Sequence, residues 1–237
     1  MLLNKNASIV VLTGAGISAE SGLDTFRGGG GLWCGHSVED VATPEAFARN
    51  PVLVHDFYNM RRKNVLDPKI QPNAAHKALA RLEQEWGGAV LVVTQNVDDL
   101  HERAGTKNLL HMHGEVLRVF CASCRHNILW HDDLSVKTAC SNCEYAGGVR
   151  PDIVWFGEMP YHMERIFEAL QDCDLFLAIG TSGHVYPAAG FVQQARAGGA
   201  ITVEANLEPS HNAHMFHETL AGPATQTLPG FIDELLR

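Results

Sequence analysis

Four short apolar runs, rich in β-branched residues, set the strongest limit on how this chain can fold. They lie at residues 8–13, 89–94, 174–179 and 200–203, and polar residues or glycine follow them. Runs of this kind are typical of buried strands, and helical patterns separate them. The alternation predicts an α/β domain with a mainly parallel sheet. We expect its chemistry at the carboxyl ends of the strands, where such sheets bind ligands.

Two helices can be placed between the predicted strands. Asn50 followed by Pro51 is typical of a helix start, with asparagine as N-cap and proline at the first position. This helix is predicted to run to about Val65. Its expected buried stripe consists of Leu53, Phe57 and Met60. A second amphipathic helix is predicted over residues 72–86, with Ala75, Leu79 and Leu82 buried.

Size and charge exclude several classes of protein. The chain has 237 residues, of which 46% are hydrophobic, so it can bury a core. No apolar run approaches the roughly 18 residues that span a bilayer, and we expect no membrane partner. The net charge of −9 is opposite to that of a non-specific nucleic-acid binder, so we expect no specific nucleic acid either. Because no secretory pattern opens the sequence, we expect a cytoplasmic protein.

A glycine-rich turn follows the first predicted strand. Gly14, Gly16 and Ala19 form a G-x-G-x-x-A pattern, whose missing side chains let backbone N–H groups approach a pyrophosphate. The alternative is a tight strand-to-helix turn without a ligand. Dehydrogenases carry an acidic, ribose-binding residue about 20 positions further on, and this chain has none there. Residues 24–31 form an irregular glycine-rich loop instead, which we expect a ligand to order.

Four of the six cysteines fall into two tight pairs. Cys121 with Cys124 and Cys140 with Cys143 each form C-x-x-C, and fifteen residues separate the pairs. This spacing is typical of a four-thiolate zinc site, which leaves no coordination position open and therefore stabilises structure instead of activating water. Chance pairing of free thiols is the alternative. Cys34 and Cys173 are expected to be buried or half-buried free thiols.

Polar residues also follow the second predicted strand. Gln95, Asn96 and Asp98 offer donors and acceptors that suit ribose hydroxyls and a carboxamide, as a nicotinamide nucleotide requires. The alternative is an ordinary helix start with Asn96 as its N-cap.

Two histidines flank Met112 further along the chain. In an extended segment His111 and His113 point to one face, so the pair can bind a metal. A general base is the other possibility, since a neutral imidazole with a pKa near about 6.5 accepts a proton from a sugar hydroxyl. Most histidines are structural, and we expect only His113 to have such a role.

Taken together, these motifs resemble those of sirtuins. The matching stretches are GAGISAESGLDTFRG from Gly14, TQNVDDLH from Thr94, HMHG from His111, the two cysteine pairs, RPDIVWFGE from Arg150 and GTS from Gly180. They occur in the family's order over residues 9–224, and the chain looks most similar to the bacterial CobB-type, class III branch. The resemblance implies an α/β fold in which a Rossmann-like, mainly parallel sheet domain carries a smaller discontinuous lobe, made of a helical insert and the four-cysteine zinc site.

The resemblance also implies an activity. Sirtuins use NAD as co-substrate to remove acyl groups from lysine side chains of proteins or peptides, with nicotinamide and O-acyl-ADP-ribose as products, and they hold one structural Zn²⁺. An NAD-linked oxidoreductase and a protein ADP-ribosyltransferase are the alternatives. A zinc-ribbon adaptor for nucleic acid is a further rival, which the charge of −9 opposes.

The residues of the site follow from the resemblance position by position. His113 would be the general base. NAD would be bound by Gly14, Ala15, Gly16, Ser18, Ala19, Glu20, Phe26, Arg27, Trp33, Gln95, Asn96, Val97, Asp98, Gly180, Thr181, Ser182, Asn206, Leu207, Glu208 and Ala224. The substrate peptide would add a strand beside Val154, Phe156, Gly157, Glu158, Val185 and Tyr186.

A Y-x-x-R pattern on the first predicted helix bears on the acyl group. Tyr58 and Arg61 lie three positions apart, hence on one helix face, and sirtuins with this pattern handle dicarboxylic acyl groups such as succinyl. Ala42 resembles the small residue that widens the acyl pocket in this branch. An ordinary surface pair is the alternative.

The expected domains are discontinuous. Residues 1–34, 76–115 and 150–237 would form the NAD-binding domain. Residues 35–75 would form the helical insert and residues 116–149 the zinc module.

Overall fold

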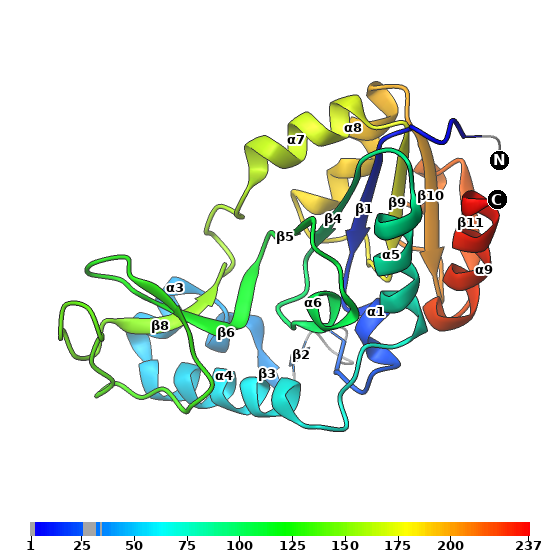
Figure 1. Cartoon of the computed structure of the whole chain (residues 1–237). Coiled ribbons are helices and arrows are strands. Elements are labelled where there is room, and N and C mark those ends of the chain that lie inside the picture. Colours follow the sequence, from blue (N-terminus) through cyan, green and yellow to red (C-terminus); the bar gives the residue numbers. More distant parts are fainter. Residues whose placement is uncertain (1–2, 26–31, 34) are drawn as a thin grey trace.

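A computed structural model describes residues 3–25, 32–33 and 35–237 of the chain (Figure 1). Its larger lobe is built on a six-stranded sheet whose neighbouring strands all run parallel. In spatial order the strands are β11 (Glu218–Ala221), β10 (Ile201–Asn206), β9 (Leu175–Ile179), β1 (Ile9–Thr13), β4 (Val90–Thr94) and β5 (Leu109–His111). The four strands predicted from sequence are confirmed, and they occupy the four central positions.

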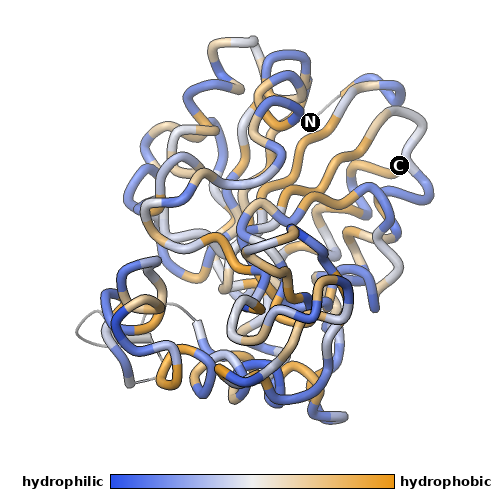
Figure 2. The backbone as a smooth tube through the Cα atoms, turned by 90° about the vertical axis from the view of Figure 1, so that its left-hand side faces the viewer, coloured by the Kyte–Doolittle hydropathy of each residue, from blue (hydrophilic) through white to orange (hydrophobic). Residues whose placement is uncertain are grey.

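Two layers of helices cover the sheet. Ile9 and Val11 point from β1 into a core shared with α5 (Ala74–Glu85) and α9 (Ala224–Leu236). Val10 and Leu12 point the other way, toward α7 (Met163–Asp172) and α8 (Phe191–Ala197). Figure 2 shows hydrophobic colour along the central strands, as expected for strands buried on both faces. Within the described residues, no helix is both long and apolar enough to cross a membrane.

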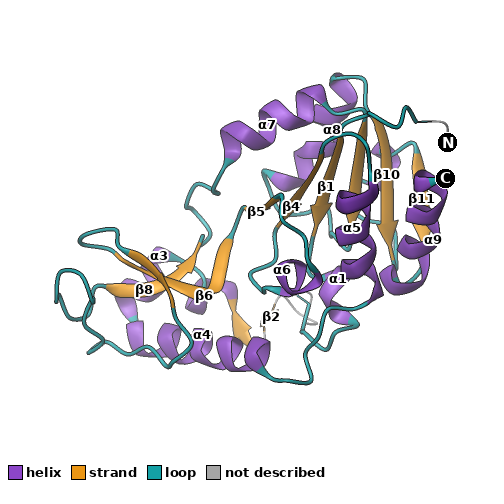
Figure 3. Cartoon of the chain, in the orientation of Figure 1, coloured by secondary structure: helices purple, strands orange, loops and turns teal. Residues whose placement is uncertain are grey.

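The smaller lobe has a three-stranded antiparallel sheet, separated from the first by loops (Figure 3). Its strands are β7 (Asn127–Leu129), β6 (Gly114–Cys121) and β8 (Val149–Ile153). Three helices pack against β6 and β8 through a second core: α2 (Val38–Val41), α3 (Pro44–Arg49) and α4 (Pro51–Leu66). A hairpin of β2 (Leu32–Trp33) and β3 (His36–Ser37) precedes them.

Short helical turns complete the fold. They are α1 (Gly16–Ala19), α6 (Leu100–Ala104) and the 3₁₀ turns Ala188–Gly190 and Ala213–Met215.

Helix α4 begins as predicted, and its buried face extends beyond the expected stripe. The Asn50 side chain accepts a hydrogen bond from the Leu53 backbone N–H at 3.2 Å, with Pro51 at the first position. Phe57 of the expected stripe is buried, while Leu53 and Met60 are half-buried and pack against the same core. The buried side chains of the helix, several of them polar, are Val54, His55, Phe57, Tyr58, Asn59, Arg62 and Val65. One side of the helix contacts the zinc module and another lines the pocket described below. Because polar side chains are buried on these sides, the apolar residues alone do not show how the helix is oriented.

The chain passes from the small lobe back to the large one after β8, which pairs with β6 in the small sheet. The chain re-enters the large sheet only at β9. The helix predicted over residues 72–86 is confirmed as α5, which Asn73 caps through hydrogen bonds from Ala75 N–H and His76 N–H.

Candidate active site

A pocket of about 590 Å³ opens at the carboxyl ends of the central strands and extends to the small lobe. All predicted co-substrate and substrate residues with described side chains line it. Those from the large lobe are Gly14, Ala15, Gly16, Ser18, Ala19, Glu20, Gln95, Asn96, Val97, Asp98, Gly180, Thr181, Ser182, Val185, Tyr186, Asn206, Leu207, Glu208 and Ala224. His113 and, from the small lobe, Ala42, Tyr58, Arg61, Val154, Phe156, Gly157 and Glu158 also line it. Phe26, Arg27, the Trp33 side chain and Cys34 lie outside the described residues.

The glycines of the first turn are required by a close approach of two loops. A Cβ at Gly14 would lie 2.7 Å from the Gly180 carbonyl oxygen, and one at Gly16 would lie 2.6 Å from Gly180 Cα. The backbone N–H groups of Gly14 and Gly16 donate to the carbonyls of Ile179 and Gly180. These two N–H groups therefore form hydrogen bonds within the protein. Within the described residues, the N–H of Ala15 in the same turn has no acceptor.

Asn96 lies at the centre of a buried polar network beneath the pocket. Its Nδ2 donates to the Gly14 carbonyl at 3.1 Å and to Ser18 Oγ at 3.2 Å. Ser18 Oγ in turn donates to Asp98 Oδ2 at 3.1 Å, and Leu100 N–H donates to Asp98 Oδ1. The N-cap of α6 is Asp99, so the alternative of Asn96 as a helix cap is wrong. Burial raises the pKa of Asp98, although these hydrogen bonds oppose the shift.

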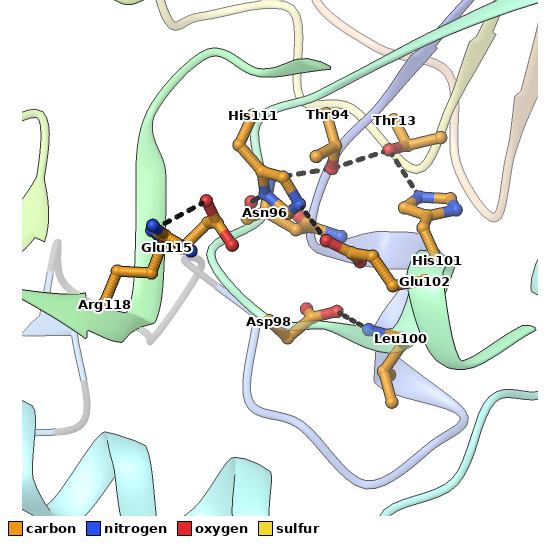
Figure 4. A network of polar contacts seen from close by, with 10 residues as sticks. All are labelled: Thr13, Thr94, Asn96, Asp98, Leu100, His101, Glu102, His111, Glu115 and Arg118. Carbon is orange, nitrogen blue, oxygen red and sulfur yellow. Dashed lines mark hydrogen bonds and ion pairs between the residues drawn. The ribbon is translucent and has the colours of Figure 1, made fainter. Parts of the chain in front are cut away.

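A second row of hydrogen bonds supports this network from below (Figure 4). His101 and Thr94 both bond Thr13 Oγ1, at 2.9 and 2.8 Å. Thr94 Oγ1 also accepts from the Asn96 backbone N–H at 3.0 Å. Burial holds the pKa of His101 well below its usual range, so the ring is neutral. The floor of the pocket is thus a hydrogen-bonded array of donors and acceptors around the neutral His101 ring.

The two histidines of the H-M-H motif have different partners. His113 Nδ1 lies 3.3 Å from the Gln95 carbonyl, and burial lowers the pKa of its ring. A carbonyl only accepts, so Nδ1 carries the hydrogen and Nε2 is left as the proton acceptor. His111 instead lies between the Asn96 carbonyl and the Glu102 carboxylate. Because these contacts separate the rings, the structure gives no support to a metal site that includes both histidines.

Tyr58 and Arg61 project from α4 to the small-lobe end of the pocket. Tyr58 is fully buried, and its oxygen accepts a hydrogen bond from Trp155 Nε1 at 3.0 Å. Burial raises the pKa of the phenol, which therefore stays protonated as a donor. Arg61 is half-buried, and Ala42 lines the same end of the pocket. Two side chains of an ordinary surface pair would not line a pocket together.

The segment after β8 is held by an ion pair that sequence reasoning missed. Both oxygens of Glu158 accept from the Arg150 guanidinium, at 2.8 and 2.9 Å, and one also accepts from the Trp155 backbone N–H. Phe156 N–H donates to the Ala42 carbonyl at 3.0 Å. The Glu158 carboxylate therefore holds the conformation of this loop. Because the carboxylate is used in this way, only the backbone of Glu158 is left for the expected contact with a peptide. Eight positions separate the pair, a spacing with no periodic signal.

Further side chains fix the opposite, large-lobe end of the pocket. Asn206 Nδ2 donates to the Thr181 carbonyl at 2.7 Å, which holds the loop after β9. Glu20 accepts from the backbone N–H and hydroxyl of Thr225 at the start of α9. Pocket residues that the sequence did not single out include Leu23, Ile153, Trp155, Pro160 and Pro223.

The four paired cysteines converge in the small lobe. Cys121 Sγ lies 3.7 Å from Cys143 Sγ, and Cys124 Sγ lies 3.6 Å from Cys140 Sγ; all four sulfurs are within 4.8 Å of one another. A tetrahedral zinc ion with Zn–S bonds of about 2.3 Å separates its ligands by about 3.8 Å. The residues therefore fit a closed zinc site. Cys173 is a buried free thiol as expected, and burial raises its pKa to about 11.

The fold and pocket define a class of protein, namely a two-lobed α/β nucleotide-binding protein with a thiolate zinc module. The chain belongs to the Sir2 family, whose model matches residues 14–187. The resemblance to sirtuins seen in the motifs is thereby confirmed.

Two relatives illustrate how close the similarity is. An NAD-dependent protein deacylase of Bdellovibrio bacteriovorus is 58% identical over 97% of this chain and 97% of that protein. One of Salmonella typhimurium is 56% identical over 98% of this chain and 85% of its own length.

Solved structures agree with the fold. A Sir2 homologue in complex with NAD has a TM-score of 0.87 at 36% identity, covering 96% of this chain and 89% of that chain. Sir2Af2 bound to a myristoylated histone peptide has a TM-score of 0.73 at 31% identity, covering 96% and 90%.

Proposed function

We propose that this protein is an NAD-dependent protein-lysine deacylase. The observation that carries the proposal is the position of His113, a ring with its pKa lowered by burial, between two kinds of pocket lining. On one side are the ends of the parallel strands, which suit a dinucleotide. On the other is the small lobe, from which Ala42, Tyr58 and Trp155 line the pocket.

NAD supplies a ribose C1′ whose bond to nicotinamide breaks as the amide oxygen of the acyl-lysine attacks it. We assign His113 Nε2 the next task, which is to take a proton from a ribose hydroxyl so that this oxygen can attack the acyl carbon. The Gln95 carbonyl holds the other ring nitrogen as a donor and so fixes the required tautomer. The neutral ring is present at pH 7 because burial keeps it from binding a proton.

Asn96 and Asp98 are proposed to orient the nicotinamide carboxamide. Since Asn96 Nδ2 is already bonded to Gly14 and Ser18, its Oδ1 is the atom left to accept the carboxamide N–H. Ala15 N–H, Thr181 and Ser182 are proposed to meet the phosphates, and Asn206, Leu207, Glu208 and Ala224 the adenosine. The remaining predicted NAD contacts, including Phe26, Arg27 and Trp33, keep that proposed role.

The acyl groups that the protein removes are proposed to include succinyl and malonyl as well as acetyl. Arg61 offers a guanidinium fork and Tyr58 a protonated phenol at the end of the acyl pocket, and both suit a distal carboxylate. The peptide is proposed to bind through backbone atoms of the loop after β8 and of Val185 and Tyr186. We propose further that the protein acts in the cytoplasm, on proteins and not on nucleic acid or membranes.

The test compares three peptides of one sequence that carry acetyl-, malonyl- or succinyl-lysine. With NAD present, we expect free lysine peptide and nicotinamide in equal amounts by mass spectrometry, with no absorbance from reduced nicotinamide. His113→Tyr is expected to abolish turnover, while His214→Tyr, at an exposed position, serves as matched control. Intact NAD and intact peptides with wild-type protein would refute the proposal. Transfer of ADP-ribose to protein would indicate the transferase alternative.

A further inference from the structure

Three successive carbonyls of the loop after β4 are held by one short segment of the chain. The Gln95 carbonyl faces His113 Nδ1, the Asn96 carbonyl faces His111 Nδ1, and the Val97 carbonyl accepts from Val116 N–H at 2.8 Å. Residues 111–116 thus hold the backbone of residues 95–97 through these three contacts. The loop that carries Asn96 and Asp98 into the pocket has its backbone set by these contacts.

His111 differs from the other two anchors because both of its ring nitrogens face acceptors. Nδ1 lies 3.1 Å from the Asn96 carbonyl, and Nε2 lies 2.7 Å from Glu102 Oε1 (Figure 4). A carbonyl oxygen and a carboxylate can only accept hydrogen bonds. Both contacts can be made together only if both nitrogens carry hydrogen, which makes His111 an imidazolium. The Glu102 side chain is 40% exposed, so water also solvates its carboxylate.

We propose that His111 and Glu102 form a positioning pair, in which the doubly protonated His111 holds the Asn96 carbonyl and so keeps the NAD-binding loop in its competent shape. The pair joins α6, which carries Glu102, to the end of β5, which carries His111. It extends the proposed function and depends on it, since it gives the same site a dependence on pH. His111 does not touch the pocket and acts only through Asn96.

The charges around His111 favour its protonated form. Burial alone would lower the pKa of His111, but the hydrogen bond and charge of Glu102 on α6, with the charge of Glu115 on β6, raise it above its usual value. Glu115 is itself paired with Arg118 at 3.8 Å. Ligand atoms of Glu102, His111 and Glu115 all lie within 4.8 Å of one another.

Three other titratable groups face the ring. The charge on His111 favours the ionised form of Asp98 in the loop and the neutral forms of His101 on α6 and His162 before α7. The pKa values of both His101 and His162 are lowered, chiefly by burial, so these rings stay neutral and oppose the His111 charge little.

Loss of one proton forces the ring to give up a contact. The charge-assisted bond to Glu102 is the stronger of the two, so the neutral ring keeps its hydrogen on Nε2 and releases the Asn96 carbonyl. We therefore expect the affinity for NAD to weaken as pH rises through the pKa of His111. Because one proton is involved, the Kd for NAD can rise at most about tenfold per pH unit.

Glu102→Gln separates this mechanism from a merely structural role. A glutamine amide can donate to Nε2, so a neutral His111 can keep its hydrogen on Nδ1 and hold Asn96 without any charge. We expect calorimetric titration with NAD from pH 6 to 9 to show a Kd that rises at alkaline pH in the wild type and stays nearly constant in this variant. Glu115→Gln is the matched control, since it removes a nearby charge but no hydrogen bond to the ring. We expect the weakening at higher pH to remain in this variant, with its midpoint at a lower pH than in the wild type.

Nuclear magnetic resonance of ¹⁵N-labelled histidine tests the charge directly, without NAD or activity. The His111 signals are assigned as those missing from His111→Gln, and we expect both ring nitrogens to be protonated at pH 7 in the wild type. A singly protonated His111 at pH 7, or the same alkaline rise of Kd in wild type and Glu102→Gln, would overturn the proposal. A wild type that binds no NAD at any pH would refute the proposed function instead, and the resonance measurement would still decide the state of His111.

Discussion

Replacing Gly16 by alanine tests why the first turn needs glycine. The added Cβ would lie 2.6 Å from Gly180 Cα and 2.9 Å from its carbonyl oxygen, whereas ordinary contact begins near 3.4 Å. The two loops would have to separate by about 0.8 Å, and both neighbours are backbone atoms that no rotamer change can move. The hydrogen bond from Gly16 N–H to the Gly180 carbonyl, 3.0 Å long, spans the same gap and would stretch.

The cost can be bounded from these contacts. Overpacking of this kind costs about 1–3 kcal/mol, and a weakened backbone hydrogen bond adds about 1 kcal/mol. For a chain of this size each kcal/mol lowers the melting temperature by roughly 2–4 °C. We therefore expect Gly16→Ala to lower the Tm of the ligand-free protein by about 5–15 °C.

Gly230→Ala provides the matched control. Gly230 lies inside α9, and a Cβ there meets nothing within 4 Å. Alanine is favoured over glycine in a helix by about 0.5–1 kcal/mol, so this variant should melt slightly higher than the wild type. Differential scanning calorimetry without NAD measures both. If Gly16→Ala melts within about 2 °C of the wild type but loses NAD binding, the glycine serves the ligand and the packing argument is refuted.

Three further predictions concern charge, metal and pH. Arg61→Met should lower kcat/KM for succinyl-lysine by about 10- to 100-fold, the value of a hydrogen bond to a charged group, and leave acetyl-lysine little changed; equal losses would contradict a carboxylate clamp. Removing zinc with a chelator should lower Tm and acyl turnover more than NAD affinity by calorimetry, because Asn59 on α4 exchanges two hydrogen bonds of 2.8 Å with Leu134 of the zinc module. Burial lowers the pKa of His76 in the folded protein to about 4, whereas the usual value is 6.5. Between these two pH values His76 therefore binds a proton in the unfolded chain but not in the folded one. Stability should fall as pH drops from about 6.5 toward 4, and a His76→Gln variant with the same acid profile would contradict this assignment.

The central sheet could be predicted because its strands are buried on both faces. Residues 9–13 and 90–94 are wholly buried and apolar except for their last threonine, which makes each a short, continuous signal. β11 has three exposed residues of four, and β5 has only three residues, so these edge strands gave no comparable pattern. β11 pairs with β10 and β5 pairs with β4. These strands form because a neighbouring strand offers hydrogen-bond partners, and their own residues do not signal this.

The site could be predicted only where one motif carries its own chemistry. The cysteine spacing by itself identifies the four zinc ligands. The polar residues after β4 lie at the expected edge of the sheet. Contacts between distant segments had no such signal. Trp155 meets Tyr58 across 97 positions, and Glu102 meets His111 from a different element. The H-M-H motif shows the limit clearly. Alternation would place both histidines on one face of an extended segment, whereas Met112 and His113 form a turn after β5 and the two rings face different carbonyls.

In the proposed assignment the two lobes hold different parts of the site, so we expect acyl preference to vary without loss of NAD binding. The end of the pocket proposed for the acyl group lies within the small lobe, where Trp155 bonds Tyr58 and Phe156 N–H bonds the Ala42 carbonyl. The end proposed for NAD lies at the ends of β1, β4, β9 and β10. His113 lies where β5 gives way to β6, and its carbonyl accepts from Val154 N–H at 2.9 Å while its ring faces the Gln95 carbonyl. Substitutions on α4 can therefore change which acyl group fits, whereas a change at His113 acts on both ends at once.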